Sequence, residues 1–300
     1  MKVLITGCNG QLGTELRYVL NRGISELGPL PKALQNAQVT GIGSDTVDIC
    51  DQQAVRDLVR EVDPDVLINC AAYTNVNGCE SDSDTAFRVN ALGPRNLAGA
   101  CRENGAKIIH LSTDYVFSGD GNMPYNEWDV CSPQSVYGHT KHLGELYVRE
   151  ITSQYFIVRT AWLYGYAGGN FVKTILKTVR ERGLLKVVDD QRGNPTNAAD
   201  LAHHLLKLAA TEEYGIYHCT GNGECSWYDF ALEIIKLSGI HCAVSPCTTE
   251  EFPTPAKRPA YSSLDNRMLR CTVGDEMRDW KDAIAAYMAN YDRKRGEIRA

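Results

Sequence analysis

Tyr137 and Lys141 stand four residues apart in the stretch VYGHTK, which spans residues 136–141. A helix that begins near Ser135 would place both side chains one turn apart on the same face. A free phenol has a pKa of about 10, and a nearby ammonium favours the phenolate and lowers that value. The pair could therefore supply a proton donor. The spacing alone is weak evidence, because a chain of this composition contains roughly 0.6 such pairs by chance.

A second segment whose residues could take part in a reaction is HLSTDYVF, residues 110–117, in which an apolar run ends in two hydroxyls and a carboxylate. Ligands of open α/β sheets bind at the carboxyl ends of the strands. The Thr113 hydroxyl could hold a substrate carbonyl oxygen there while a nicotinamide delivers hydride to the carbon. The alternative is that Ser-Thr-Asp caps a helix or forms a turn.

Three glycines, Gly7, Gly10 and Gly13, directly follow the first apolar run and open a helical pattern. Glycines in such a turn permit a tight bend and a close approach to a pyrophosphate, and the helix N-terminus supplies amide donors. The spacing is G-x-x-G-x-x-G rather than the dinucleotide fingerprint G-x-G-x-x-G. An ordinary glycine turn is the alternative, but both flanking elements favour a dinucleotide site.

Short apolar runs alternate with helical patterns over the first half of the chain. We expect buried parallel strands at residues 2–6, 39–43, 65–69, 107–111 and 156–160. Helical intervals occur at 52–62 and at 84–104, and Gly93-Pro94 can kink the second of these helices. The β-α-β order predicts an α/β fold with a Rossmann-type, doubly wound parallel sheet.

The alternation loosens after residue 160, although a further strand is expected at 185–189. We predict a dinucleotide-binding domain made of residues 1–160 and about 185–218. A smaller, discontinuous C-terminal substrate domain should comprise about 161–184 and 219–300.

The composition is that of a soluble globular protein, with 43% hydrophobic and 23% charged residues and a net charge of −6. That charge gives a phosphate backbone no attraction, so we expect no nucleic-acid partner. The opening MKVLITG is too short for a signal-peptide core, and no stretch reaches membrane-spanning length, so we expect a cytoplasmic protein without a membrane partner. The 11 cysteines are odd in number and lack C-x-x-C spacing, which predicts reduced thiols.

Eight segments, in order along nearly the whole chain, resemble the extended short-chain dehydrogenase/reductases and, within them, the dTDP-4-dehydrorhamnose reductases. They are TGCNGQLG (6–13), NCAAYTNVNGCES (69–81), FRVNALGPRNLA (87–98), LSTDYVFSG (111–119), VYGHTKHLGE (136–145), VRTAWLYG (158–165), DDQRGNPT (189–196) and PTPAKRPAYSSL (253–264). The last four distinguish this branch from nucleotide-sugar epimerases and dehydratases.

The resemblance implies roles for individual residues. Tyr137 would be the proton donor, Lys141 its electrostatic partner and a contact to the nicotinamide ribose, and Thr113 the hydroxyl on the substrate carbonyl. The implied coenzyme-binding residues are Gly7, Gly10, Gln11, Leu12, Gly13, Asp48, Ile49, Ala71, Ala72, Tyr73, Thr74, Tyr137 and Lys141. The implied substrate-binding residues are Thr113, Asp114, Tyr115, Trp162 and Arg258. A core position is the alternative for Trp162, and a surface position in a proline-rich loop is the alternative for Arg258.

The sequence departs from the family pattern at two places. Gly43 stands where such reductases often carry an acidic residue at the end of the second strand, so we expect NADPH as coenzyme, with NADH also accepted. The run TNVNGCE (74–80) replaces a TAVDKAE-like run near the coenzyme. Glu15 matches one glutamate through which some relatives bind a divalent ion between subunits, but the full set is not evident, so no metal is expected.

These features predict an NAD(P)H-dependent reductase of the 4-keto group in a nucleotide-linked 6-deoxyhexose, with dTDP-4-dehydro-L-rhamnose as substrate and dTDP-L-rhamnose as product. One alternative is a reductase or epimerase of another nucleotide sugar. Another is a non-catalytic regulatory subunit similar to that of methionine adenosyltransferase, against which the intact Thr113, Tyr137 and Lys141 argue. A homodimer is expected from the general frequency of such assemblies.

Overall fold

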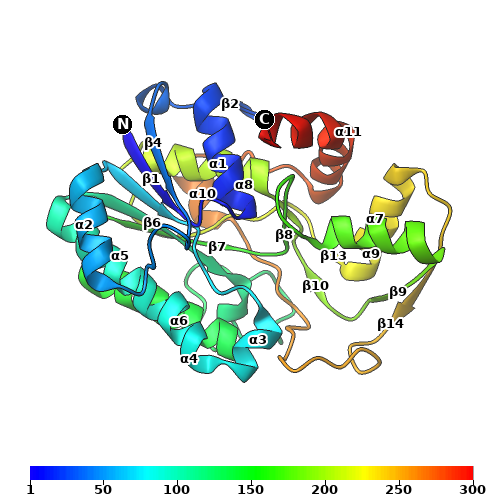
Figure 1. Cartoon of the computed structure of the whole chain (residues 1–300). Helices are drawn as coiled ribbons and strands as arrows, with labels where there is room; N and C mark the ends of the chain where they lie inside the picture. Colours follow the sequence, from blue (N-terminus) through cyan, green and yellow to red (C-terminus); the bar gives the residue numbers. More distant parts are fainter. Residues whose placement is uncertain (300) are drawn as a thin grey trace.

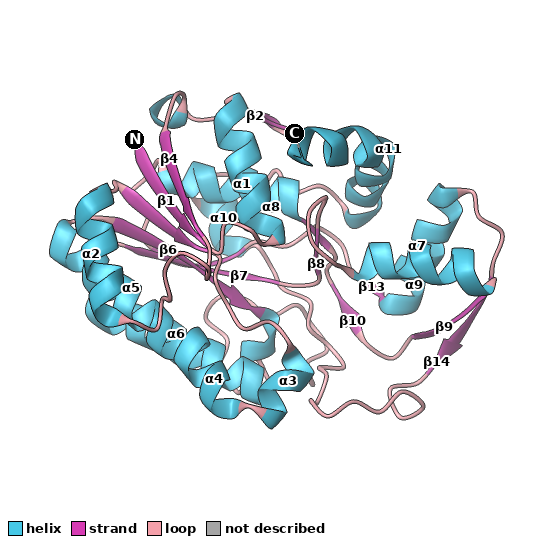
Figure 2. Cartoon of the chain, in the orientation of Figure 1, coloured by secondary structure: helices cyan, strands magenta, loops and turns pink. Residues whose placement is uncertain are grey.

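The computed structural model describes residues 1–299, and a six-stranded parallel sheet lies at its centre (Figure 2). The strands are β1 (Lys2–Thr6), β4 (Gln38–Ile42), β5 (Val66–Asn69), β6 (Lys107–Thr113), β7 (Tyr155–Thr160) and β12 (Gly215–His218), in the spatial order β12-β7-β6-β5-β1-β4. The predicted α/β fold with a Rossmann-type parallel sheet is confirmed, and the sequence analysis missed only the edge strand β12 of this sheet.

Helices cover both faces of the sheet, which explains why its central strands are continuous apolar runs. One face packs against α2 (Gln52–Val62), α5 (Gly93–Asn104) and α6 (Val136–Ile151), and the other against α1 (Gln11–Arg22) and α8 (Ala198–Ala209) (Figure 1). All four residues of β5 are buried. The two hydrophobic layers fix the sheet and therefore the loops that leave its carboxyl edge.

The strand order reverses at β1, because the chain passes from β1 to β4 on one side and returns to β5 on the other. Such a switch point opens a crevice between the loops that follow the two central strands. Gly7 lies in this crevice with φ +67°. A Cβ on Gly7 would lie 2.6 Å from the Ala71 backbone nitrogen, so only glycine fits between the two loops.

The helix expected at residues 84–104 is broken where Gly93-Pro94 predicted a kink. A short α4 (Ser83–Phe87) follows α3 (Val76–Ser81) and runs into a π-helical turn at Arg88–Leu92, after which α5 begins at Gly93. Pro94 stands in the first turn of α5, where its missing N–H leaves no helical hydrogen bond unmade.

A second group of elements lies to one side of the sheet. β9 (Leu184–Val188) pairs in parallel with β14 (Ala243–Cys247), beside α7 (Phe171–Arg182) and α9 (Trp227–Ser238) (Figure 1). The sequence analysis placed the strand at 185–189 with the dinucleotide-binding segments, but its pairing with β14 puts it among the substrate-side elements. The exact division of the chain into two domains stays a prediction.

Short elements complete the described chain. The small strand pairs are β2 (Ile24–Ser25) with β3 (Gly28–Pro29), β8 (Leu163–Tyr164) with β11 (Thr196–Asn197), and β10 (Arg192–Gly193) with β13 (Cys225–Ser226). Single helical turns lie at Lys32–Leu34 and Asp114–Val116, and α10 spans Arg267–Cys271. Across residues 1–299, no helix combines the length and the apolar character needed to cross a membrane.

The last helix, α11 (Trp280–Arg299), links the substrate-side elements to α1. Trp280 belongs to the hydrophobic cluster that also contains α7 and α9 residues. At the other end of α11, Glu297 accepts hydrogen bonds from Tyr18 and from Arg22, the latter at 3.0 Å. The helix that begins at the glycine turn is therefore tied to the substrate side of the molecule.

Candidate active site

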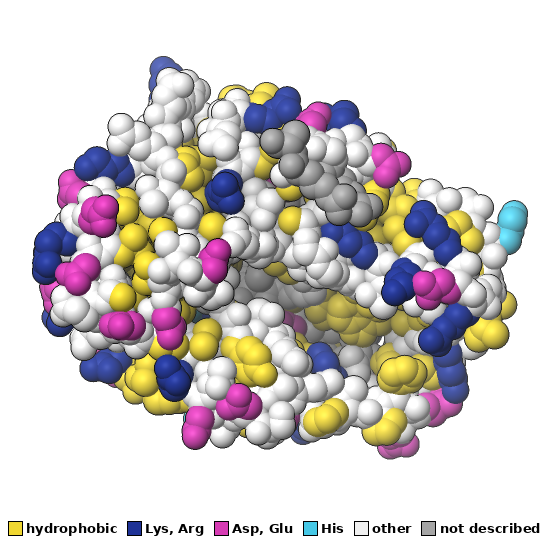
Figure 3. Space-filling view, viewed as in Figure 1, with side chains coloured by type: hydrophobic (Ala, Val, Ile, Leu, Met, Phe, Trp, Pro, Cys, Tyr) yellow, Lys and Arg dark blue, Asp and Glu magenta, His cyan; other side chains and the backbone are white. Residues whose placement is uncertain are grey.

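A large cavity, with a volume of about 1090 Å³, lies between the carboxyl edge of the sheet and the substrate-side elements. The loops after β1, β4, β5 and β6 form one wall, and residues of α7, α9 and β9 form the other. Figure 3 shows the hollow near the middle of this face. Its position at the switch point of the sheet is where nucleotide ligands bind in open α/β folds.

The structure brings almost all of the predicted site residues together around this cavity. Those that line it are Gly7, Gly10, Gln11, Leu12, Gly13, Asp48, Ile49, Ala71, Ala72, Thr74, Thr113, Asp114, Tyr115, Tyr137, Lys141, Trp162 and Arg258. Tyr73 is the exception, since it is absent from the lining. Its backbone N–H donates to the Asn90 side chain at 2.8 Å and its carbonyl accepts from the same amide at 3.1 Å, so it anchors the loop instead.

The glycine turn provides a cradle that fits a pyrophosphate. A Cβ on Gly13 would collide with the Gly7 carbonyl and lie 2.6 Å from Cys8 Cα, so the turn closes tightly against the start of α1. Gly10, the N-cap, offers no side-chain oxygen to the free amides, and the first turn of α1 carries no acidic residue. This bare helix N-terminus faces the cavity with its positive dipole end.

Helix α6 begins as the sequence analysis predicted, with Ser135 as N-cap accepting a hydrogen bond from the Gly138 N–H at 3.1 Å. A Cβ on Gly138 would collide with the Tyr115 carbonyl, so glycine allows this helix start to press against the segment that follows β6. The contact places Tyr137 beside Thr113, and both residues line the cavity. A phenol and an alcohol thus meet at the end of β6.

Thr113 also caps a turn. The cap predicted as the alternative for Ser-Thr-Asp is therefore present, and the same hydroxyl remains a candidate to contact a substrate. Its hydroxyl accepts from the Tyr115 N–H at 3.3 Å and donates to the Asp114 carboxylate at 2.8 Å. Burial raises the pKa of Asp114 to about 6, against the hydrogen bond from Thr113, which lowers it. The cap holds the Thr113 oxygen at the cavity wall.

The predicted lowering of the Tyr137 pKa by Lys141 is wrong in this structure. Burial raises the pKa of Tyr137 above its usual value and the Asp114 charge raises it further, whereas the Thr113 hydrogen bond lowers it. The Lys141 ammonium donates to the Leu111 carbonyl at 2.5 Å, and burial lowers its pKa to about 8. Desolvation is the largest cause of the shift in the Tyr137 pKa, so Tyr137 is a neutral phenol that still holds its proton near neutrality.

Arg258 reaches from the proline-rich loop into the site rather than into solvent. Its Nη1 donates to the Tyr115 hydroxyl at 2.9 Å and its Nη2 to the Asn77 side chain at 3.4 Å. The Tyr115 ring in turn meets the Tyr137 ring edge-on, with 5.5 Å between the centroids. A fixed positive charge therefore stands beside the phenol pair.

Trp162 combines the two roles considered for it, because it lines the cavity and also packs against other aromatic side chains. It has φ +48° and stacks on Trp227 with 3.5 Å between the ring centroids. Sequence reasoning missed Trp227, because nothing in the local pattern links it to Trp162. It also missed Gln191, which lines the cavity although it stands in the DDQRGNPT segment.

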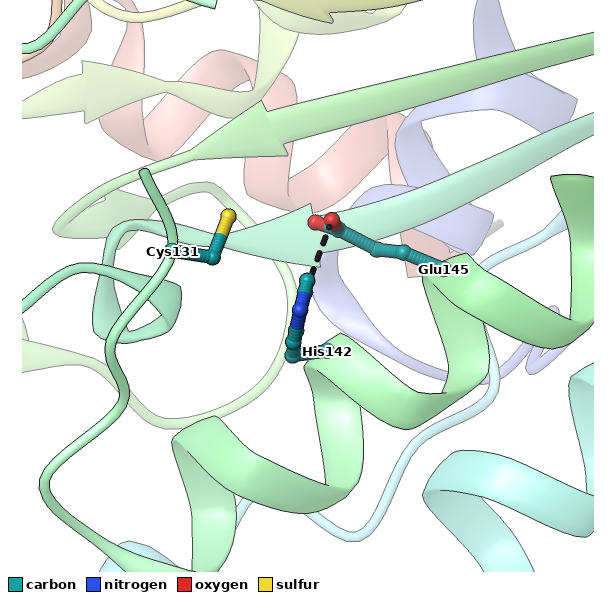
Figure 4. A group of neighbouring side chains, drawn as sticks. All are labelled: Cys131, His142 and Glu145. Atoms are coloured by element: carbon teal, nitrogen blue, oxygen red, sulfur yellow. Dashed lines mark hydrogen bonds and ion pairs between the residues drawn. The ribbon is translucent and has the colours of Figure 1, made fainter. Parts of the chain in front are cut away.

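Two clusters contain side chains of the types that can bind a metal ion. The Glu15 carboxylate lies 3.5 Å from the Lys294 ammonium, which is also 3.4 Å from Glu26. Cys131, His142 and Glu145 converge in the other cluster (Figure 4). In both clusters a side-chain cation of the protein already lies against the carboxylate: Lys294 in the first, and Arg159 at 2.8 Å from Glu145 in the second.

Comparisons with known proteins agree with this geometry. The model of the RmlD substrate binding domain family matches residues 1–293. A dTDP-4-dehydrorhamnose reductase of Streptomyces griseus is 42% identical over 288 residues, which cover 94% of this chain and 91% of the relative.

Two solved structures share the whole architecture. A dTDP-4-dehydrorhamnose reductase of Clostridium acetobutylicum is 47% identical with a TM-score of 0.91, covering 97% of this chain and 100% of the other. The Bacillus anthracis dTDP-4-dehydrorhamnose reductase in complex with NADP is 39% identical with a TM-score of 0.91, covering 96% and 99%. This chain therefore belongs to the RmlD substrate binding domain family, among the dTDP-4-dehydrorhamnose reductases.

Proposed function

We propose that this protein reduces the 4-keto group of a nucleotide-linked 6-deoxyhexose with NADPH, converting dTDP-4-dehydro-L-rhamnose to dTDP-L-rhamnose. The observation that carries the proposal is that Tyr137, Thr113 and the glycine turn line the same cavity. The names of the relatives support the sugar and the coenzyme.

The chain's own residues divide the work of the reaction. NADPH, when bound, supplies the hydride for the carbonyl carbon. Thr113 would hold the carbonyl oxygen by a hydrogen bond, and Tyr137 would donate the proton that completes the alcohol. The raised pKa of Tyr137 keeps the phenol protonated until the oxygen becomes a strong base during hydride transfer. Lys141 would hold the ribose that carries the nicotinamide.

The coenzyme and the sugar nucleotide would enter the cavity from opposite ends. The bare N-terminus of α1 and the glycine turn suit the coenzyme pyrophosphate. Arg258 suits the diphosphate of the sugar nucleotide, because a guanidinium donates several hydrogen bonds in one plane. Asp114, Tyr115 and Trp162 would contact the sugar between them.

The deciding experiment incubates the purified protein with NADPH and a panel of nucleotide 4-ketosugars that differ in the sugar and in the base. Oxidation of NADPH with the dTDP-linked 4-keto-6-deoxyhexose, and little with the others, is the expected result. Turnover of a different member of the panel would move the assignment to another nucleotide sugar, and turnover of none would favour a regulatory subunit. We also expect a homodimer and a cytoplasmic location, which light scattering and cell fractionation test.

A further inference from the structure

Helix α6 carries a buried carboxylate one turn after Lys141. Lys141 and Glu145 are 3% and 1% exposed, and their i, i+4 spacing places them on the same face of the helix. Arg159, at 2% exposure, binds Glu145 from β7 with both arms of its guanidinium: Nε to Oε1 at 2.9 Å and Nη2 to Oε2 at 2.8 Å. Such a bidentate pair fixes both side chains in one orientation.

The far side of this ion pair continues towards the surface. Arg159 Nη2 also donates to Cys131 Sγ at 3.2 Å, and His142 Nδ1 lies 3.4 Å from Glu145 Oε2 (Figure 4). Glu145, one helical turn after Lys141, is thus held against β7, with the Cys131 and His142 side chains at the outer edge of the network.

The titratable groups that act on the Lys141 ammonium come from three elements. Glu145 lies on α6, Cys70 follows β5, and His110 lies on β6. Burial raises the pKa of Cys70 to about 12 and holds the pKa of His110 well below its usual value, so both are neutral near pH 7. Burial also acts to raise the pKa of Glu145, but Arg159 outweighs it, and the net pKa is well below the usual range. Glu145 is therefore the negative charge in this set. Two cations face it: Arg159 from β7, and His142 on α6, where Cys131 and Glu145 raise the pKa of the imidazole to about 9.

We propose that Glu145 is a positioning residue that acts through Lys141: its buried carboxylate keeps the Lys141 ammonium charged, while Arg159 fixes that carboxylate against β7. The proposal rests on the proposed function, because it assigns to Lys141 the contact with the coenzyme. It gives the buried ion pair a task in the reaction beyond the packing of α6.

The consequence is a specific pH dependence. Burial lowers the pKa of Lys141 to about 8 even with Glu145 present. A lysine with a lowered pKa loses its charge as pH rises through that value, so coenzyme affinity should fall near pH 8. Without the Glu145 charge, the Lys141 pKa has less to support it and the fall should begin at lower pH.

The test compares Glu145→Gln with Arg159→Lys. The first removes the negative charge and keeps the shape, whereas the second weakens the fork geometry of the same ion pair and keeps both charges. NADPH binding to each full-length protein is followed by fluorescence from pH 6 to 9, without any sugar. We expect Glu145→Gln to move the midpoint of the affinity loss down by about one to two pH units, the size of a near charge in a buried site. Arg159→Lys should leave the midpoint in place.

Equal behaviour of the two variants, whether the same midpoint shift or the same uniform loss, would overturn the proposal and leave a purely structural ion pair. If Glu145→Gln does not fold, the double variant Glu145→Met with Arg159→Met removes both charges without an orphaned ion. A downward shift is again expected, but a smaller one, because the opposing charge of Arg159 is lost as well. Binding needs no ketosugar, so a protein that shows this pH behaviour but reduces no member of the panel would refute the proposed substrate and leave the role of Glu145 intact.

Discussion

The carboxylate of Asp45 lies over the Cα of Gly43, at the end of β4. A Cβ on Gly43 would collide with Asp45 Oδ1 and would lie 2.6 Å from the Asn9 side-chain nitrogen. Asp45 thus brings a negative charge to the place where a strand-end acid would stand, although it comes from two residues further along the chain. An acid at this place binds the adenosine ribose hydroxyls and repels the extra phosphate of NADPH.

Asp45→Asn should therefore raise the ratio of kcat/KM for NADPH to that for NADH. We expect the unaltered protein to use both, with NADPH at least as good, because the exposed Asp45 side chain can turn away from the phosphate. Loss of its charge should raise the ratio by about three- to tenfold, the latter equivalent to roughly 1.4 kcal/mol. Both coenzymes are assayed with the same ketosugar at one moderate ionic strength. An unchanged ratio would show that Asp45 has no part in coenzyme choice.

Tyr137→Phe should lower kcat by about two to four orders of magnitude, because it removes the proposed proton donor and hardly changes the shape of the side chain. NADPH affinity should survive, since the proposed partner of the phenol is the substrate carbonyl. Tyr147→Phe is the matched control, because Tyr147 lies on the same helix and does not line the cavity. Near-normal turnover of Tyr137→Phe on the true substrate would rule out the proposed acid.

Local sequence patterns were enough to predict the parts of the site that are built from one turn or one strand end. Three such parts are the glycine turn, the end of β6 and the start of α6. In each of them, a strand or helix boundary coincides with residues of a distinctive type: glycines, hydroxyls with a carboxylate, or a tyrosine and a lysine. Thr113 ends β6, and Tyr137 stands in the first turn of α6, which begins at the same edge of the sheet. Their closeness therefore followed from the fold.

The rest depended on contacts between residues far apart in the chain. Trp227 stacks on Trp162 only because α9 packs beside the cavity. The partner of the strand at Leu184–Val188 could not be predicted, because an apolar run of this length is the same in any parallel pair, and only the fold shows that it pairs with β14. The Tyr137 pKa was mispredicted because helical spacing gives the distance to Lys141 but says nothing of the burial of the phenol.

Arg258→Met should raise the KM for the ketosugar nucleotide by at least about tenfold, as expected for the loss of a charge-assisted phosphate contact. The KM for NADPH should change little, because Arg258 bonds to Tyr115 and Asn77 and not to the glycine turn that suits the coenzyme pyrophosphate. Lys257→Met is the matched control: the neighbouring residue is exposed and does not line the cavity. Equal KM values in the two variants would place Arg258 outside the substrate site.

Glu15 should make the stability of the fold depend on pH near neutrality. Burial raises its pKa to about 7, helped by the charge of Glu26 and opposed by that of Lys294. A carboxyl group of an unfolded chain titrates near 4.3. Between these two values the folded state binds more protons than the unfolded state, so the free energy of unfolding falls as pH rises. The contribution of Glu15 is complete below the unfolded pKa and is lost as pH rises through about 7.

The Gln side chain of Glu15→Gln cannot ionise. The free energy of unfolding of this variant, minus that of the unaltered protein, should therefore increase as pH rises from 5 to 8. The measurement is urea unfolding at several pH values in this window. Glu297→Gln serves as the control on α11, because the hydrogen bond from Tyr18 lowers the pKa of Glu297 and its carboxylate stays ionised throughout the window. Its curve against pH should run parallel to that of the unaltered protein. A Glu15→Gln curve that also runs parallel would mean that Lys294 keeps Glu15 ionised, and that burial does not govern its charge.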